Sequence, residues 1–154
     1  MLAAAHRLRR SPDFSSTVRG TGSARSGSRR LVVHVNRRST ATAAVASSPA
    51  DAGPVPRVGF VVSRAVGNAV VRNRTKRVLR HLMATRLEPL PCDADVVVRA
   101  NPAAAGATTD ALAGDLDRCL RGALDKLDRH GPDDHGPDHH GPDHQGLDRR
   151  GEGR

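Results

Sequence analysis

Aromatic residues are almost absent from this chain of 154 residues: there is no tryptophan or tyrosine, and Phe14 and Phe60 are its two phenylalanines. A core must rely on valine, leucine and alanine, so we expect marginal stability that improves when a partner binds the folded state. Two isolated cysteines, Cys92 and Cys119, form no CxxC motif, which is typical of a reducing cytoplasm. No apolar run approaches the ~20 residues that cross a bilayer, and Arg7 interrupts the N-terminal apolar stretch before a signal-peptide core could form. We therefore expect a cytoplasmic protein with no membrane partner.

Acidic residues are also scarce where the chain has its apolar patterns. Lys and Arg number 25 and Asp and Glu 16, for a net charge of +9. Six of the acids and three arginines fall in residues 130–154, which leaves residues 1–129 with a net charge of +12. A small domain with such a charge repels itself, and a polyanion is the obvious partner.

Capping residues and the spacing of apolar side chains predict a regular series of elements. Ser11 is suited to cap an N-terminal helix, with Pro12 at the first helical position and Gly20 as the stop. The elements that follow are a turn or short edge strand over 21–28, strands over 31–35 and 57–62, a helix over 69–87, a strand over 94–99, and a helix capped by Thr108 or Thr109. Helix, strands, helix, strand, helix is the order of a small α+β sandwich with helices over a sheet.

Two segments lack the features of a packed core. Residues 39–56 contain one charge, Asp51, among Ala, Ser, Thr and Pro, and predict a flexible insertion within the domain of residues 1–129. Residues 130–154 begin with three copies of a His-Gly-Pro-Asp repeat and predict a disordered tail. The tail histidines could chelate a transition metal, but a solvated tail is the preferred interpretation.

The helix predicted over 69–87 concentrates cations. Arg72, Lys76 and Arg80 recur every four residues and so are expected to line one face. A solvated basic helix usually interleaves acids at i,i+4, yet none occurs between Gly67 and Leu87. Polyanion binding is therefore favoured over an ordinary solvated face. Three further residues are expected beside these cations: Asn73, Arg77 and Arg74.

At this helix the chain resembles a known family, the protein subunit of bacterial ribonuclease P. Its signature is matched by Arg72-Asn73-Arg74, with Ala69 before it and Lys76-Arg77 and Arg80 after it. The strand and turn ahead of the signature match through Arg57–Arg64 and Gly67-Asn68-Ala69. The N-terminal segment matches through Arg7-Leu8, Asp13-Phe14, Val18 and Gly20. The resemblance covers about residues 6–128 without the insertion. The chain departs from the family at Thr75, where an aliphatic residue is usual, and at Val18 and His34, where aromatics are common.

The resemblance implies a fold, an activity and a set of contacts. The fold has a left-handed crossover around the signature helix, which composition could not show because such crossovers are right-handed in ~98% of cases. The holoenzyme is an endoribonuclease that removes the 5′ leader from precursor tRNA, with one protein joined to one catalytic RNA. Magnesium is expected with that RNA, and no metal or other cofactor on the protein itself. The implied RNA-subunit contacts are Arg64, Asn68, Arg72, Asn73, Arg74, Lys76, Arg77 and Arg80. The implied leader contacts are Phe14, Val18 and His34.

The residues themselves indicate that the protein does not perform the hydrolysis. A two-metal nuclease needs carboxylates that converge, whereas the acids here are scattered, and Asp93 with Asp95 is interpreted as a solvated turn. Cys119 is expected in the core and Cys92 in a loop, and Phe14 could be a core residue as well as a leader contact. Two other functions remain open: a ribosomal or general nucleic-acid-binding protein that uses the same helix, and a stand-alone metal nuclease.

Overall fold

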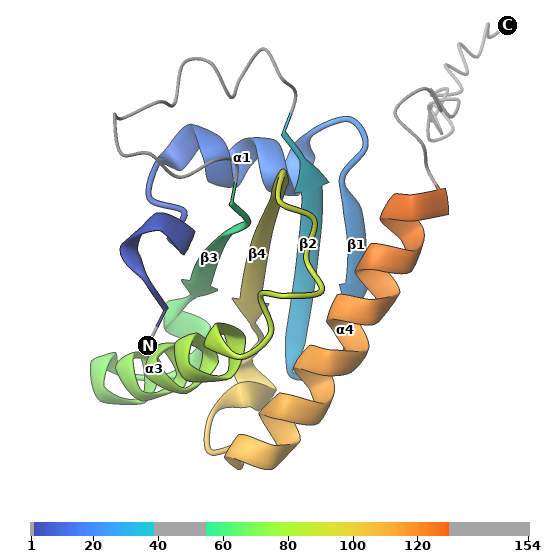
Figure 1. The fold of residues 1–154 in the computed structure, drawn as a ribbon. Coiled ribbons are helices and arrows are strands. Elements are labelled where there is room, and N and C mark those ends of the chain that lie inside the picture. The colour runs from blue at the N-terminus through green and yellow to red at the C-terminus, as the bar shows by residue number, and fades with distance from the viewer. Residues whose placement is uncertain (1, 39–54, 130–154) are drawn as a thin grey trace, which may run out of the picture.

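The fold is a four-stranded sheet covered by helices on both faces (Figure 1). The structure, a computed structural model, describes residues 2–38 and 55–129. Its helices and strands are α1 (Ser11–Arg19), β1 (Ala24–Gly27), β2 (Leu31–Arg37), β3 (Arg57–Val62), α3 (Ala69–Ala84), β4 (Ala94–Ala100) and α4 (Thr109–Arg129). Three short 3₁₀ helices are η1 (Ala4–His6), η2 (Arg64–Val66) and η3 (Pro102–Ala104). The order of elements agrees with the predicted α+β sandwich.

The strands lie in the order β1-β2-β4-β3, so β1 is the predicted edge strand. β2 pairs antiparallel with both β1 and β4, while β3 pairs parallel with β4 in a register that places Val58 beside Val96. The connection from β3 to β4 runs through α3 on the face that also carries α4, and in Figure 1 its path is left-handed. The crossover that the family resemblance implied is therefore present.

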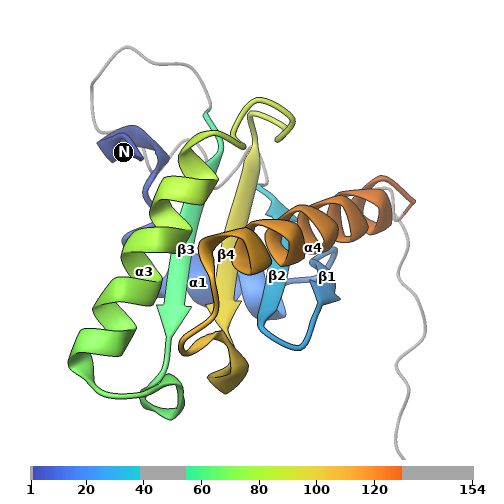
Figure 2. The ribbon, with the colours of Figure 1, turned by 90° about the horizontal axis from the view of Figure 1, so that it is seen from below.

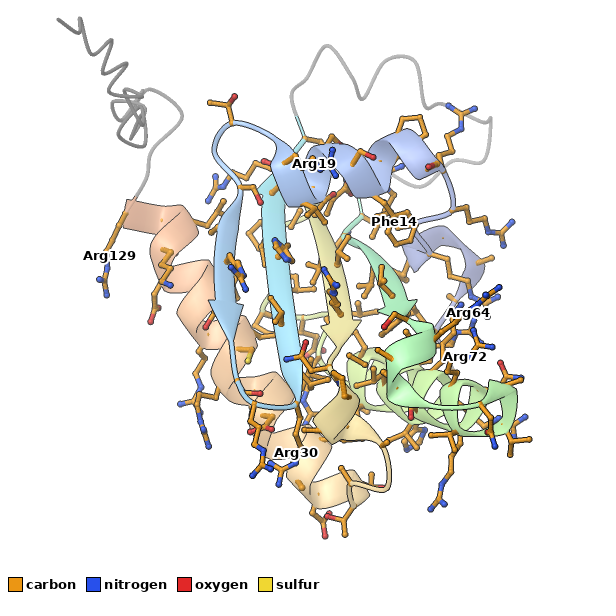
Figure 3. All side chains as sticks on the ribbon, turned by 180° about the vertical axis from the view of Figure 1, so that it is seen from behind. Phe14, Arg19, Arg30, Arg64, Arg72 and Arg129 are labelled. Atoms are coloured by element: carbon orange, nitrogen blue, oxygen red, sulfur yellow. The ribbon has the colours of Figure 1, made fainter. Side chains whose placement is uncertain are left out.

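The main core lies between the sheet and α4, with α3 beside it. Figures 1 and 2 show α3 and α4 on the same face, and Figure 3 shows α1 across the opposite face. Side chains alternate along a strand, so β2 directs Leu31, Val33 and Val35 toward the core, and all three are fully buried. The predicted stripe on α4 is buried as well: Leu112, Leu116, Leu120, Ala123 and Leu127. Cys119 lies in this core and Cys92 is exposed, as predicted.

The ends of two helices differ from the sequence prediction. Ser11 is the first residue of α1 and not its cap: the Arg10 carbonyl accepts the first helical hydrogen bond, from Phe14 N–H at 3.3 Å, and no side chain caps this end. α3 ends at Ala84, three residues before the predicted Leu87. For α4, the Thr108 hydroxyl accepts a hydrogen bond from Ala111 N–H at 3.2 Å, so Thr108 is its cap.

A buried ionic cluster joins the starts of β3 and β4 to α1. Arg57 binds Asp95 through two hydrogen bonds of 2.9 and 2.6 Å, and its Nη1 donates to Asp13 of α1 at 3.2 Å. Arg38 adds a second cation at 3.4 Å from the Asp95 carboxylate. The interpretation of Asp95 as part of a solvated turn is therefore wrong: its side chain is 5% exposed. β4 begins at Ala94, and the register places Asp95 directly beside Arg57.

Arg38 also holds together the two ends of the predicted insertion. Its Nη2 donates to the Val55 carbonyl at 2.8 Å and to the Cys92 carbonyl at 2.7 Å. Pro56 is buried, and its carbonyl lies 2.8 Å from His6 Nδ1. Val55 and Pro56 therefore belong to the folded domain. The rest of the predicted insertion, residues 39–54, and the predicted tail, residues 130–154, lie outside the described residues. Of the helices that are described, none combines the length and the apolar character needed to cross a membrane.

Candidate nucleic-acid interface

α3 is fixed by a strong start and by one apolar side. Gly67 precedes it with a φ of 148°, a conformation that L side chains rarely adopt. The Asn68 side chain then caps the helix by accepting a hydrogen bond from Val71 N–H at 3.0 Å. The inner side buries Thr75, Leu79, Leu82 and Met83, while the predicted Val71 and Val78 are only partly buried beside them. The result is a helix whose remaining surface is free for other contacts.

Thr75, the departure from the family pattern, is accommodated on this inner side. Its side chain is buried, and its hydroxyl donates to the Val71 carbonyl at 2.9 Å. A buried hydroxyl with its hydrogen bond satisfied costs little, so this substitution leaves the helix in place.

The cations of α3 form a continuous arc around its exposed surface, in which Arg80 lies about 60° from Arg77. Consecutive residues differ by about 100° around the axis, so Lys76 and Arg80 share one side, which we call the pocket flank. Arg74, expected beside them, lies roughly 160° from Lys76. It shares the outward face with three other exposed residues: Val70, Asn73 and Arg77.

The remaining two cations lie near the start of α3. Arg64 is exposed on η2, and Figure 3 shows Arg64 and Arg72 at the η2 end of α3, beyond the edge of β3. Arg72 is half-buried, and its Nε is shielded from solvent without a hydrogen-bond partner in the described part of the chain. Arg72 therefore lies closer to the body of the fold than the other cations of the helix.

The pocket flank borders a pocket of about 290 Å³. The N-terminal segment forms one wall, because Leu8 N–H donates to the Val58 carbonyl at 3.0 Å and so holds residues 2–9 along the free edge of β3. The lining combines apolar residues with four cations and contains no acid: Leu2, Arg7, Leu8, Arg9, Phe14, Val58, Gly59, Phe60, Lys76 and Arg80.

The three predicted leader contacts belong to α1 and to the sheet face that α1 covers. Phe14 packs directly on Gly59 of β3: a Cβ added there would lie 2.5 Å from the Phe14 Cζ. Val18, one turn further along α1, is 37% exposed. His34 lies on β2, and its alternation with Val33 and Val35 turns it away from the main core. The structure thus places all three on one side of the sheet.

His34 has a cationic surrounding that sequence reasoning did not include. Arg25 is its direct partner on β1, and Arg99 is the next residue of β4 on the same face. Burial of the imidazole, and then the charges of Arg25 and Arg99, lower the pKa of His34 below its ordinary value of 6.5. The ring is therefore neutral at neutral pH, and the positive charge of this face comes from the arginines beside it.

Three groups at this surface were missed from the sequence. Arg25 and Arg99 face the same side because of the strand register, and the alternation of side chains along each strand was a signal that could have indicated them. Arg9 lines the pocket only because the N-terminal segment pairs with β3, which lies about fifty residues further along the chain. No local pattern signals such a contact.

The described residues offer no cluster for hydrolytic metal chemistry. Within residues 2–38 and 55–129, no three His, Cys, Asp or Glu side chains come close enough to share a metal ion. The Asp95 carboxylate is occupied by Arg57 and Arg38. What the surface does provide is fixed positive charge beside an aromatic ring.

A four-stranded sheet with a left-handed crossover, whose crossing helix is basic and free of acids, defines a distinctive class of small α+β protein. Comparison with known proteins identifies that class: the family model described as Ribonuclease P matches residues 2–124, and the chain belongs to this family. A ribonuclease P protein component from Nocardioides sp. is 51% identical over 120 residues, which cover 78% of this chain and 92% of the relative. The one from Streptomyces bikiniensis is 50% identical over 124 residues, which cover 80% and 96%.

Solved structures support the fold. The ribonuclease P protein of Staphylococcus aureus superposes with a TM-score of 0.60 at 23% identity, over 75% of this chain and 93% of that protein. The protein of Thermotoga maritima gives a TM-score of 0.56 at 21% identity, over 81% and 97%. Family membership implies a role as the protein component of an endoribonuclease, with an RNA subunit as its partner.

Proposed function

We propose that this protein binds the RNA subunit of ribonuclease P through α3 and the 5′ leader of precursor tRNA along the α1 face of the sheet. In this way it assists the catalytic RNA in endonucleolytic removal of the leader. The observation that carries the proposal is the surface of α3: a capped helix, buried on one side only, that presents cations without a single acid.

The outward face of α3 is the part suited to a folded RNA. Arg74 and Arg77 are exposed, and Asn73 beside them adds an amide that can donate and accept. Residues three and four apart are about 6 Å from one another on a helix, so their side chains can meet successive phosphates. Arginine is suited to this contact because its planar fork binds a phosphate through two hydrogen bonds.

The α1 face is suited to an unpaired strand. Single-stranded RNA is commonly held by a basic groove together with stacking on aromatic side chains. Here Phe14 supplies the ring and Val18 an apolar contact without a π face, while neutral His34, only 9% exposed, can add no more than a small contact. Arg25 and Arg99 supply the charge.

The proposal has three consequences for the complete enzyme. Catalytic magnesium is held by the RNA subunit, and the protein contributes no metal ligand or other cofactor. One protein joins one RNA in the proposed complex. The complex works in the cytoplasm, where precursor tRNA is processed.

Reconstitution from purified parts tests the proposal. The protein without RNA should not cleave precursor tRNA, and the cognate ribonuclease P RNA should supply the activity, with faster or tighter processing when the protein is added at low magnesium. Failure of the protein to affect that RNA would instead favour a general nucleic-acid-binding role. Cleavage by the protein alone, lost with a chelator, would favour a metal nuclease.

The salt dependence of binding tests the outward face more directly. Substituting Arg74→Ala or Arg77→Ala should weaken binding of the RNA subunit. Each should also reduce the slope of log K against log salt by about 0.7–0.9 for the phosphate contact that is lost. Arg121→Ala removes an exposed cation of α4 that is not part of the proposed surface; it is the control and should leave the slope unchanged. Unchanged slopes in both α3 variants would contradict the proposed docking surface.

A further inference from the structure

The turn between β1 and β2 carries a second group of cations, separate from those of α3. The turn contains Arg29 and Arg30, and Arg118 of α4 lies beside it. Asp115 joins the two elements: its carboxylate accepts a hydrogen bond from Arg30 Nη1 at 3.1 Å, and its other oxygen lies 3.9 Å from Arg118 Nη1. We call Arg29, Arg30 and Arg118 the sheet-end cluster. Three cations around one carboxylate leave this group with a net positive charge.

The backbone of this turn is fixed by hydrogen bonds from both sides. The Ser28 hydroxyl accepts hydrogen bonds from the N–H groups of Arg30 and Leu31, at 3.2 and 3.1 Å. Asn101, which follows β4, donates from its side chain to the carbonyls of Ser28 and Arg29, at 3.3 and 3.2 Å. Its backbone N–H also donates to the Arg30 carbonyl at 2.8 Å. A turn held in this way keeps its arginines in place before a partner binds, which lowers the entropic cost of binding.

Asp115 orients the cluster and leaves its positive charge exposed. The Asp115 side chain is 7% exposed, whereas those of Arg30 and Arg118 are 37% and 74% exposed. Arg30 uses only Nη1 in this contact, so its other N–H groups have no protein partner in the described part of the chain. Arg29 is exposed, and its side chain has no hydrogen bond or ion pair within residues 2–38 and 55–129. The surface offered to a partner is therefore made of guanidinium groups.

The chemistry of the cluster favours a phosphate backbone over unpaired bases. Stacking of bases needs aromatic side chains, and both phenylalanines of the chain line the pocket beside β3. The planar fork of arginine instead binds a phosphate through two hydrogen bonds. The sheet-end cluster is thus suited to the outer surface of a folded RNA.

The cluster lies at the end of the sheet where α3 begins. β3 and β4 are parallel, so η2 and η3, which follow them, are in contact at one end. The β1–β2 turn lies at this end too, because Leu31 pairs with Ala100, the last residue of β4. α1 is bound through Asp13 to Arg57 at the other end of β3, and Figure 3 shows Arg30 and α1 at opposite ends of the sheet.

This position places the cluster within reach of an RNA that docks on α3. Neighbouring strands lie about 4.8 Å apart. The start of β2 and the end of β3 are two strands apart, so about 10 Å of backbone separates them. Arg64 of η2, beside the start of α3, lies between the helix and this end of the sheet. A folded RNA can therefore contact α3 and the sheet-end cluster together.

We infer that the sheet-end cluster binds backbone phosphates of the RNA subunit, as a second contact that adds to docking through α3. Arg29 and Arg118 make the most exposed contacts, and Arg30 is oriented by Asp115. This inference rests on the proposed function, which places the RNA subunit on α3 and the leader on the α1 face.

Single substitutions of two arginines test the inference against a matched control. Arg29→Ala and Arg118→Ala each remove one charge and leave the bond between Arg30 and Asp115 in place, so both variants should fold, which circular dichroism checks. Arg129→Ala is the control, because it removes an exposed arginine at the far end of α4 (Figure 3). Each variant is measured for affinity to the isolated RNA subunit over a range of salt concentrations.

Arg29→Ala and Arg118→Ala should each weaken binding about tenfold, the value of one charge-assisted contact. Each should also reduce the slope of log K against log salt by about 0.7–0.9, while the control keeps the affinity and slope of the wild type. Arg29→Lys should keep the slope, because the charge remains, and recover only part of the affinity, because the fork is lost. In hydroxyl-radical footprinting, Arg29→Ala should expose one short segment of the RNA subunit and leave the segment protected by α3 unchanged.

The outcomes separate failure of this inference from failure of the proposed function. Wild-type affinity and slope in both sheet-end variants would contradict the inference, as expected if the cluster binds an acidic protein, while α3 docking would stand. The inference is also wrong if RNA-subunit affinity is unchanged and tRNA affinity in the holoenzyme falls instead, whether or not the ratio of precursor to mature tRNA affinity changes. If the sheet-end variants lose affinity and the Arg74 and Arg77 variants do not, docking through α3 fails and the sheet-end contact stands.

Discussion

The packing of Phe14 on Gly59 can be tested by adding a single methyl group. A Cβ at position 59 would lie 2.5 Å from the Phe14 Cζ and 3.2 Å from the Leu8 Cβ, so either α1 or the ring must move. Overpacking of this kind costs about 1–3 kcal/mol, offset by about 0.4–1 kcal/mol because alanine restricts the unfolded chain more than glycine. We therefore expect Gly59→Ala to lower the free energy of unfolding by about 1–2 kcal/mol, a fall in Tm of roughly 4–8 °C.

Thermal and urea unfolding measure this loss, and the same substitution elsewhere provides its control. Gly114 of α4 has no atom within 4 Å of an added Cβ, so Gly114→Ala should stabilise the protein by about 0.5–1 kcal/mol through helix propensity. If Gly59→Ala is neutral or stabilising as well, the ring does not pack on β3 as described.

A second substitution separates packing from leader binding. Phe14→Leu in the Gly59→Ala background makes room for the methyl group and should recover part of the lost stability. It should not recover the precursor-to-mature affinity ratio, because stacking on an aromatic ring, roughly 1–3 kcal/mol per base, is lost with the ring. Recovery of both quantities would show that Phe14 serves the core alone.

Three further predictions concern buried groups. Asp95→Ala should lower the free energy of unfolding by about 3 kcal/mol in urea unfolding, because it strands the buried Arg57 charge, and a loss below 1 kcal/mol would argue against the ionic cluster. Because the folded-state pKa of His34 is below its ordinary 6.5, the unfolded chain binds the proton more readily, so stability should fall as the pH drops below about 6.5. His34→Gln should reduce this pH dependence, and an unchanged profile would show that other groups cause it. A thiol reagent should modify Cys92 rapidly and Cys119 only on unfolding, since burial raises the pKa of the Cys119 thiol and shields it; equal rates in the native protein would contradict its burial.

The elements of this fold could be predicted because their signals are local. The last helix is capped by Thr108, and the apolar stripe from Leu112 to Leu127 follows within the same segment. The break before α3 is encoded in the adjacent Gly67 and Asn68. The left-handed crossover has no such local signal, and it was expected only because the signature helix resembles that of a known family.

The contacts that could not be predicted join distant parts of the chain. Asp95 looked like a solvated residue because its partner Arg57 lies 38 residues away and meets it only through the register of β3 and β4. The pocket depends in the same way on a long-range contact, the pairing of the N-terminal segment with Val58 of β3. For the cations of α3, the four-residue spacing identified Lys76 and Arg80 as neighbours. That Lys76 and Arg80 line a pocket, whereas Arg74 is exposed about 160° away from Lys76, could not be predicted from the spacing.

Because Arg38 donates a hydrogen bond to the Val55 carbonyl, the stability of the fold should depend only weakly on the number of residues between them. Arg38 and Val55 are held together, and the entropic cost of joining two such fixed points grows only with the logarithm of the number of residues between them. Doubling that length costs about 0.6 kcal/mol, less than a single buried methylene group contributes. This junction is therefore a position where a change in chain length should cost the folded domain little stability, and where an experimenter can insert a tag or a reporter domain.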